Sequence, residues 1–305
     1  MKKLHLLIFI AALAMTACKD KSQNTTQDNQ ANTTLQPERI ELDEDLFDKE
    51  NKYANVRISI QIADEDDDKT PVATAINRQL LQEIDKEFNT DIKTDKQAYA
   101  PYRGDSDDSE DIVKYYGEKT LQILTANSKQ DQEIRLENLS EAQADLAQQT
   151  IFQYSHYMDL HSSFETDRFI VFSINTSTYY GGAHPNSATR ALTFDKTDGT
   201  ILTQWFTPQA IKDLQPILRK GLTEYFNTTD QGQTVTEANL NQYLQIEGTE
   251  IPLSSNIQPT KDGLALTYGQ YEIACYAMGM PTLTIPYATV RPYLSIEAQQ
   301  LLPKE

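Results

Sequence analysis

The pattern of apolar and polar residues after residue 50 predicts a strand followed by a helix. Val56, Ile58, Ile60 and Ile62 alternate with polar residues, which is the period of a half-buried strand. An acidic run from Asp64 to Asp68 ends this segment. Thr70 and Pro71 then stand in the order of a helix cap and a first-turn proline. The apolar residues that follow recur every four positions and indicate one buried helix face: Ile76, Leu80, Ile84 and Phe88.

Two further helices are predicted before residue 160. One begins at Ser109, after the loop of residues 101–108. The other begins with a capping box, in which Ser140 is followed three residues later by Gln143. Its apolar stripe consists of Ala147, Ile151, Tyr154 and Met158.

From residue 168 the pattern is typical of strands. Residues 169–174 are apolar at both alternating sets of positions, which predicts a strand in the centre of its sheet. The chain turns at Gly181-Gly182, returns over residues 190–194, and turns again at Asp198-Gly199 into residues 201–203. A capped helix is predicted from Thr207-Pro208, with Ile211, Leu214, Leu218, Leu222 and Tyr225 on one side. Further strands are expected over 264–268, 271–276 and 282–285.

Strands and helices come in blocks, which predicts an α+β fold with antiparallel sheets, helices packed against them, and two subdomains. We place the boundary near residue 165. A helix-rich N-terminal module then covers residues 39–165, and a sheet-richer C-terminal α+β domain covers residues 166–305.

The first 17 residues resemble a lipoprotein signal peptide. Two lysines precede an apolar stretch over residues 6–15, which is too short to span a membrane. Residues 15–18 resemble the lipobox of bacterial lipoproteins, which implies that cleavage exposes Cys18 and that its thiol carries a lipid. Residues 18–38 then form a flexible polar tether. We expect an anchor in the bacterial cell envelope, at the outer membrane, with the face left open; the alternative is a secreted protein.

Charge and composition exclude several classes of function. The chain has 27 Lys and Arg against 45 Asp and Glu, a net charge of −18, which argues against nucleic-acid binding. Two cysteines and four histidines leave little material for a disulfide framework or a metal centre, so no cofactor is expected. Cys275 lies in an apolar run and is interpreted as a buried, inert thiol.

Motifs for known chemistry are lacking in the sequence. It contains no G-x-S-x-G, S-x-x-K, Walker or H-E-x-x-H pattern. An EF-hand frame that starts at Asp107 has Ile112 where glycine is required, so the acidic residues are interpreted as solvated caps. His156 and His161 fall on the helix predicted after Ser140, where a spacing of five separates them by roughly 140°.

The segment Tyr179 to Asn186 is the best candidate for a binding loop. Gly181 and Gly182 permit positive φ, and Pro185 stiffens the turn beside His184. The segment therefore presents an imidazole and an amide beside tyrosines, which suits sugar or protein binding. The candidate ligand-binding residues here are Tyr180, Gly181, Gly182, His184 and Asn186. The alternative is a glycine turn whose polar side chains bond to the backbone.

The same loop carries a resemblance to a known family. The run from Tyr180 to Asn186, residues 192–195, 198–200 and Trp205-Phe206 resembles the C-terminal domain of RsiV-type lysozyme-sensing anti-sigma factors. Residues 263–268, 271–279 and 284–287 are similar to the closing segments of that family. More weakly, residues 56–88 resemble the small module that precedes this domain in such receptors and in some peptidoglycan deacetylases. The resemblance implies an envelope binding domain of about residues 168–295.

This resemblance favours a binding module for a lysozyme-like protein or a cell-wall glycan. It adds Glu272 and Tyr276 to the candidate ligand-binding residues, if the two family segments meet in space. An acidic chain also suits a strongly basic c-type lysozyme. Two alternatives stay open: an envelope polysaccharide hydrolase or transferase with His184 as base and Glu272 as its partner, or a purely structural envelope lipoprotein.

Overall fold

The computed structural model describes residues 40–64, 71–91, 100–137, 139–140, 143, 151–229 and 234–304. The predicted signal peptide, Cys18 and the tether lie outside these ranges. Residues 65–68 of the acidic run, Thr70 and Ala147 also lie outside them. Within the described ranges, no helix combines the length and the apolar character needed to cross a bilayer.

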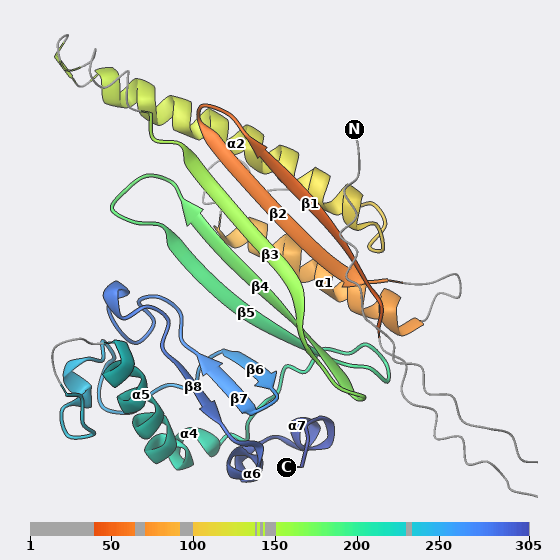
Figure 1. Ribbon diagram of the computed structural model, residues 1–305, viewed down its shortest axis with the longest axis vertical. Coiled ribbons are helices and arrows are strands. Elements are labelled where there is room, and N and C mark those ends of the chain that lie inside the picture. Colours follow the sequence, from red (N-terminus) through yellow and green to blue (C-terminus); the bar gives the residue numbers. More distant parts are fainter. Residues whose placement is uncertain are drawn as a thin grey trace, which may run out of the picture. The chain divides into compact units, whose positions relative to one another are not determined.

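A five-stranded sheet forms the first layer of the fold, in the order β1-β2-β3-β4-β5 (Figure 1). The strands are β1 (Leu42–Glu50), β2 (Ala54–Ala63), β3 (Tyr154–Glu165), β4 (Phe169–Tyr179) and β5 (Asn186–Asp195). Neighbours are antiparallel except for β2 and β3, which are parallel. The chain between this parallel pair contains α1 (Pro71–Asp91) and α2 (Ser109–Glu137), because parallel neighbours need a long crossover.

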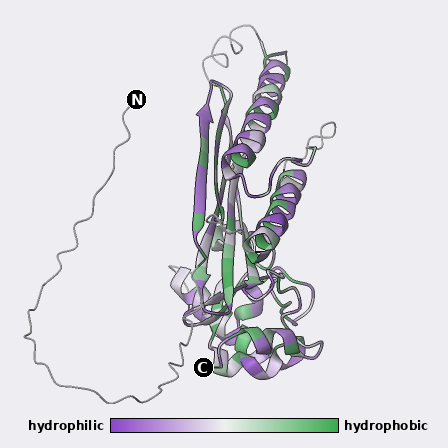
Figure 2. Cartoon of the chain, turned by 90° about the vertical axis from the view of Figure 1, so that its right-hand side faces the viewer, coloured by the Kyte–Doolittle hydropathy of each residue, from purple (hydrophilic) through white to green (hydrophobic). Residues whose placement is uncertain are grey.

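Both long helices cover the same face of this sheet (Figure 2). The predicted alternation in β2 is confirmed, since Val56, Ile58 and Ile60 are completely buried. The predicted face of the first helix is also confirmed, because all four of its apolar residues from Ile76 to Phe88 are completely buried. These side chains share one hydrophobic cluster with β3, β4 and α2. The strand and helix thus pack as their two periods require.

The helix predicted through Tyr154 and Met158 is wrong. Ser140 and Gln143 do bond as in a capping box, with the Ser140 N–H 3.2 Å from Gln143 Oε1. Residues 154–165, however, form β3, where Tyr154, His156, Met158 and Leu160 are buried in alternation. His156 and His161 therefore lie on opposite faces of a strand, since their separation is odd.

A second sheet and several short helices follow β5. The strands are β6 (Asn256–Thr260), β7 (Gly263–Thr267) and β8 (Thr282–Ile285), all antiparallel. The helices are α4 (Ala210–Asp213), α5 (Gln215–Thr229), α6 (Tyr287–Val290) and α7 (Ile296–Leu301), with 3-10 turns η1 (Leu240–Gln242), η2 (Tyr276–Met278) and η3 (Arg291–Tyr293). The predicted helix after Pro208 is thus divided into α4 and α5 at Leu214.

The packing of β4 explains why this strand is apolar on both faces. Ile170, Phe172 and Ile174 join the cluster under α1 and α2, whereas Phe169 and Val171 join a second cluster with α5, β7 and β8. The α+β class is confirmed, with the refinement that the large sheet is mixed. The boundary predicted near residue 165 stays a prediction; residue 165 ends β3, and β4 and β5 continue the same sheet.

Candidate functional site

The loop between β4 and β5 has the backbone that its glycines suggest. Gly181 has φ +83° and Gly182 has φ +105°, a region that L side chains rarely adopt. Tyr179 Oη donates a hydrogen bond to the Gly182 carbonyl at 3.1 Å, which closes the turn. Residues 181–186 are all exposed, including His184 and Asn186. The hairpin therefore presents His184 to solvent on a loop whose turn is held by its own contacts.

His184 lies against two tyrosines from a distant part of the chain. Its ring stacks on Tyr276 with centroids 3.6 Å apart and an interplanar angle of 21°. Its Nε2 is 3.2 Å from Tyr271 Oη, and the Tyr271 ring centroid is 6.2 Å away. The two segments that carry the family resemblance thus meet in space at His184 and Tyr276.

The backbone of the loop is also tied to this second segment. Tyr276 Oη donates to the Pro185 carbonyl at 3.0 Å. At the start of β5, the Ser187 N–H donates to Gln270 Oε1 at 2.9 Å. These bonds fix the position of the loop relative to residues 270–276, so the three rings are arranged before any partner arrives.

The strand predicted over residues 271–276 is wrong, because residues 271–274 form a turn and Tyr276 begins η2. Tyr271 has φ +62°, which an L residue adopts at a cost of about 1–2 kcal/mol. Glu272 Oε2 accepts from the Gly269 N–H at 2.6 Å and so closes the turn before it. Ile273 and Ala274 are buried in the second cluster and anchor the turn. The result is that Tyr271 is held in the open, with 55% of its surface exposed.

The contacts of His184 define its hydrogen-bonding roles in the neutral ring. Nδ1 is 2.9 Å from the Pro185 carbonyl, which can only accept, so Nδ1 carries the proton. Nε2 is then the acceptor for the Tyr271 hydroxyl. The carboxylate of Glu272 is turned toward the backbone of Gly269, so the structure pairs His184 with tyrosines.

Tyr180, the first candidate residue of the loop, faces the interior. Its Oη is 3.3 Å from His156 Nδ1, and its ring lies beside Tyr154 with centroids 5.9 Å apart. His156 is completely buried and stacks on Phe88. Burial lowers the pKa of the His156 imidazole to about 4, so the ring is neutral at pH 7. Tyr180 thus anchors the base of the loop in the core.

The remaining candidates for chemistry are Cys275, which directly precedes Tyr276, and the acidic residues near Asp107. Cys275 is a free thiol that is only partly buried, so the expectation of a buried cysteine is not met. The acidic residues near Asp107 accept hydrogen bonds from other side chains: Asp107 accepts from Asn77, and Asp111 accepts from Tyr102. Over the described part of the chain, no group of three His, Cys, Asp or Glu side chains is arranged to hold a metal ion.

Tyr271 and Gln270 are the residues of this site that sequence reasoning did not select. Tyr271 belongs to the segment that carries the resemblance, but its positive φ leaves no signal in the residue type. Gln270 acts through its side-chain oxygen on the Ser187 backbone, a contact between residues 83 apart. Neither the positive φ of Tyr271 nor the contact of Gln270 has a local sequence pattern.

Comparison with known proteins identifies one family domain in the chain. The model of the family described as "Protein of unknown function (DUF3298)" matches residues 205–288. This range includes Tyr271, Glu272 and Tyr276, whereas the loop with His184 precedes it. None of the curated proteins compared with the chain matches it.

Two solved structures of DUF3298 family proteins are similar to this chain. The one from Bacteroides fragilis has 20% sequence identity and a TM-score of 0.61, over 85% of this chain and 95% of its own. The one from Pseudomonas aeruginosa has 13% identity and a TM-score of 0.47, over 86% of this chain and 97% of its own. The first likeness shows a shared fold and does not assign a function. Residues 205–288 therefore form a DUF3298 family domain within a fold that the Bacteroides protein shares.

Proposed function

We propose that this chain is an envelope lipoprotein that binds a lysozyme-like protein through the ring cluster of His184, Tyr271 and Tyr276. The observation that carries the proposal is the stack of the exposed His184 on Tyr276, 3.6 Å between centroids, beside a Tyr271 that is 55% exposed. Exposed aromatic side chains that are already fixed in position are the usual anchors of protein interfaces.

The ring cluster suits binding because its loop and side chains are already ordered before a partner binds. The loop is closed by Tyr179 and tied to residues 270–276 by Gln270 and Tyr276. Tyrosine adds a large contact area for the loss of few side-chain rotamers. A partner that covers these rings removes apolar surface from water without having to reorganise the loop.

The nature of the partner rests on two arguments. The loop and the segment at Tyr271 resemble RsiV-type lysozyme-sensing receptors, as described above. The net charge of −18 would also steer a strongly basic c-type lysozyme toward this chain. The anchor on Cys18 would hold the module at a membrane of the cell envelope.

The contacts favour binding over acid–base catalysis by His184. A general base needs a nitrogen lone pair free for its substrate, and the Nε2 lone pair here faces the Tyr271 hydroxyl. Glu272, the partner that a hydrolase would need, closes the turn at Gly269 instead.

Calorimetric titration with a c-type lysozyme tests the proposal. The chain from Lys19 onward would be titrated at low and at physiological salt, beside the His184→Ala and His161→Ala variants. We expect saturable binding at both salts and at least a roughly 10-fold weaker affinity in His184→Ala. His161→Ala is the matched control, because this partly exposed histidine lies on β3; its affinity should equal that of the parent chain.

Three results would contradict the proposal. Binding that disappears at physiological salt would reflect charge attraction alone. Equal affinity in His184→Ala would remove the ring cluster from the interface. Absence of binding at either salt would exclude lysozyme as the partner and make peptidoglycan fragments the next ligands to titrate.

A further inference from the structure

A cavity of about 750 Å³ lies where β2 and β3 end, in residues separate from the ring cluster. Gln61, Ser162, Ser163 and Thr166 give it amide and hydroxyl groups, and Phe164 gives it an aromatic wall. This volume is within the range of small-molecule sites in proteins. The lining is richer in hydrogen-bonding groups than that of a typical lipophilic pocket, so the ligand should be polar.

A β-bulge shapes this cavity. The register of β3 against β4 shifts between Ser162 and Phe164, which leaves Ser163 as the extra residue. Bulges redirect side chains and are frequent beside binding sites. The Ser163 hydroxyl is fixed by Ser173, whose Oγ donates to it at 2.8 Å, and by Gln258 of β6 at 3.0 Å. The redirected hydroxyl is therefore held by two separate elements.

Two of the three charged side chains that line the cavity form an ion pair. Lys196 Nζ is 2.7 Å from Glu165 Oε1, and the two side chains are only 9% and 13% exposed. Because the positive and negative charges of this buried pair cancel, the pair does not attract an ion. Asp167 is exposed in the turn after β3. The chemistry of the interior thus favours an uncharged ligand.

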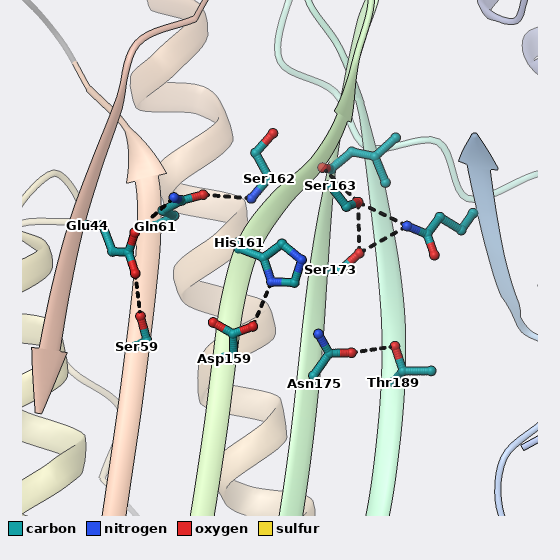
Figure 3. A network of polar contacts seen from close by, with 12 residues as sticks. Glu44, Ser59, Gln61, Asp159, His161, Ser162, Ser163, Ser173, Asn175 and Thr189 are labelled. Atoms are coloured by element: carbon teal, nitrogen blue, oxygen red, sulfur yellow. Dashed lines mark hydrogen bonds and ion pairs between the residues drawn. The ribbon is translucent and has the colours of Figure 1, made fainter. Parts of the chain in front are cut away.

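A row of polar side chains continues from the cavity across the face of the sheet opposite the helices (Figure 3). Gln61 joins both parts, since its Oε1 accepts from the Ser162 N–H at 2.9 Å and its Nε2 donates to Glu44 at 3.0 Å. Two further pairs lie on this face: Asp159 with His161 at 2.8 Å, and Asn175 with Thr189 at 2.8 Å. These mutual contacts hold the polar groups in place before a ligand binds.

We propose that this cavity and the adjoining polar row bind a neutral oligosaccharide. Sugar hydroxyls donate and accept at once, as do the serine, threonine and amide groups that line the site. The C–H face of a sugar ring can pack against an aromatic wall such as Phe164. The row beyond Gln61 gives a second or third ring a place to lie. The inference goes beyond the proposed function, because it uses none of the residues of the ring cluster.

An NMR titration with the trimer of N-acetylglucosamine tests this site. Every residue of both hydrophobic clusters lies at or after Ile40, so a chain from Lys19 keeps the whole described core. We expect saturable shifts of the amide signals of residues 61, 162–166 and 196 at ligand concentrations up to about 10 mM, the range of a weak site. Gln61→Ala should weaken the affinity at least about 10-fold, and Ser162→Trp should fill the cavity and abolish the shifts.

The controls distinguish specific binding at this cavity from nonspecific attraction. Gln122→Ala removes the same amide from an exposed position on α2 and should leave the affinity unchanged. The amide spectrum of each variant shows whether it is folded. The deacetylated, cationic trimer is titrated in parallel at physiological salt. No saturable shift with the neutral trimer, equal shifts in both cavity variants, or binding of the cationic trimer alone would each overturn the proposal.

Discussion

Acid should destabilise this protein through His156, the buried imidazole beneath the loop. The side chain has no exposed surface, its ring stacks on Phe88 with centroids 5.3 Å apart, and its Nδ1 is 3.3 Å from Tyr180 Oη. Burial lowers the pKa of His156 from its ordinary value of 6.5 to about 4. In the unfolded chain the imidazole is exposed and regains its ordinary pKa.

The sign and size of the effect follow from linkage. Well above pH 6.5 the imidazole is neutral in both states, and the full stability is present. As the pH falls from 6.5 to 4, only the unfolded state takes up the proton, so the free energy of unfolding decreases. Each pKa unit is worth about 1.4 kcal/mol, which gives a total of about 3 kcal/mol, of which about 2 kcal/mol is lost between pH 7 and pH 5.

Urea denaturation of the parent chain and of the His156→Phe and His156→Gln variants measures the contribution of His156 to the free energy of unfolding. Carboxyl groups also titrate in acid, but they contribute equally to all three proteins, so the difference between parent and variant isolates His156. Measurements stop at pH 5 because the solubility of the protein falls as the pH approaches its isoelectric point near 4.6. The stability of the parent relative to each variant should fall by about 2 kcal/mol from pH 7 to pH 5. A difference that stays constant within about 0.5 kcal/mol, the error of the extrapolation, would refute the reasoning.

Three substitutions give further tests. Asn77→Ala should lower the free energy of unfolding in urea by about 3 kcal/mol, because buried Asn77 pairs with both the N–H and the carbonyl of Ala63, at 2.9 and 2.8 Å. Gly263→Ala should cost more than about 2 kcal/mol in the same assay, since its φ is +141° and a Cβ would lie 2.2 Å from the Ile285 carbonyl oxygen; a near-neutral result would contradict this. Tyr271→Gly should leave the thermal midpoint unchanged or higher by relieving its positive φ, and yet weaken lysozyme binding. Weaker binding that is accompanied by a lower midpoint would count against a direct role of the Tyr271 ring.

The periodic elements could be predicted from the sequence where only one period fits. The alternation of β2 and the four-residue spacing of α1 each continue over several residues, and both elements form as predicted. Tyr154 and Met158 in β3 are also four apart, but four is a multiple of the strand period as well as close to a helical turn. The buried His156 between them interrupts the apolar alternation, which conceals the strand.

The candidate site was predictable only in part. The positive φ of Gly181 and Gly182 follows from residue type, and the contact of His184 with Tyr276 was expected only from the family resemblance. The inward direction of Tyr180 could have been predicted from parity, because the even-numbered residues of β4 face the helices. The left-handed backbone of Tyr271 is imposed by its tertiary surroundings and has no sequence signal.

The parallel pairing of β2 with β3 has a consequence for the newly made chain. Ala54 pairs with Tyr154, so the parallel partner of β2, which is β3, is synthesised 100 residues after it. Until then, the hairpin of β1 and β2 has an open edge with unpaired backbone groups, next to the apolar face of Val56, Ile58 and Ile60. Two halves of the sheet, β1–β2 and β3–β5, can each form from local contacts, but they can join only along this single seam. Nascent chains that stall before residue 154 should therefore be the species most prone to pair with one another.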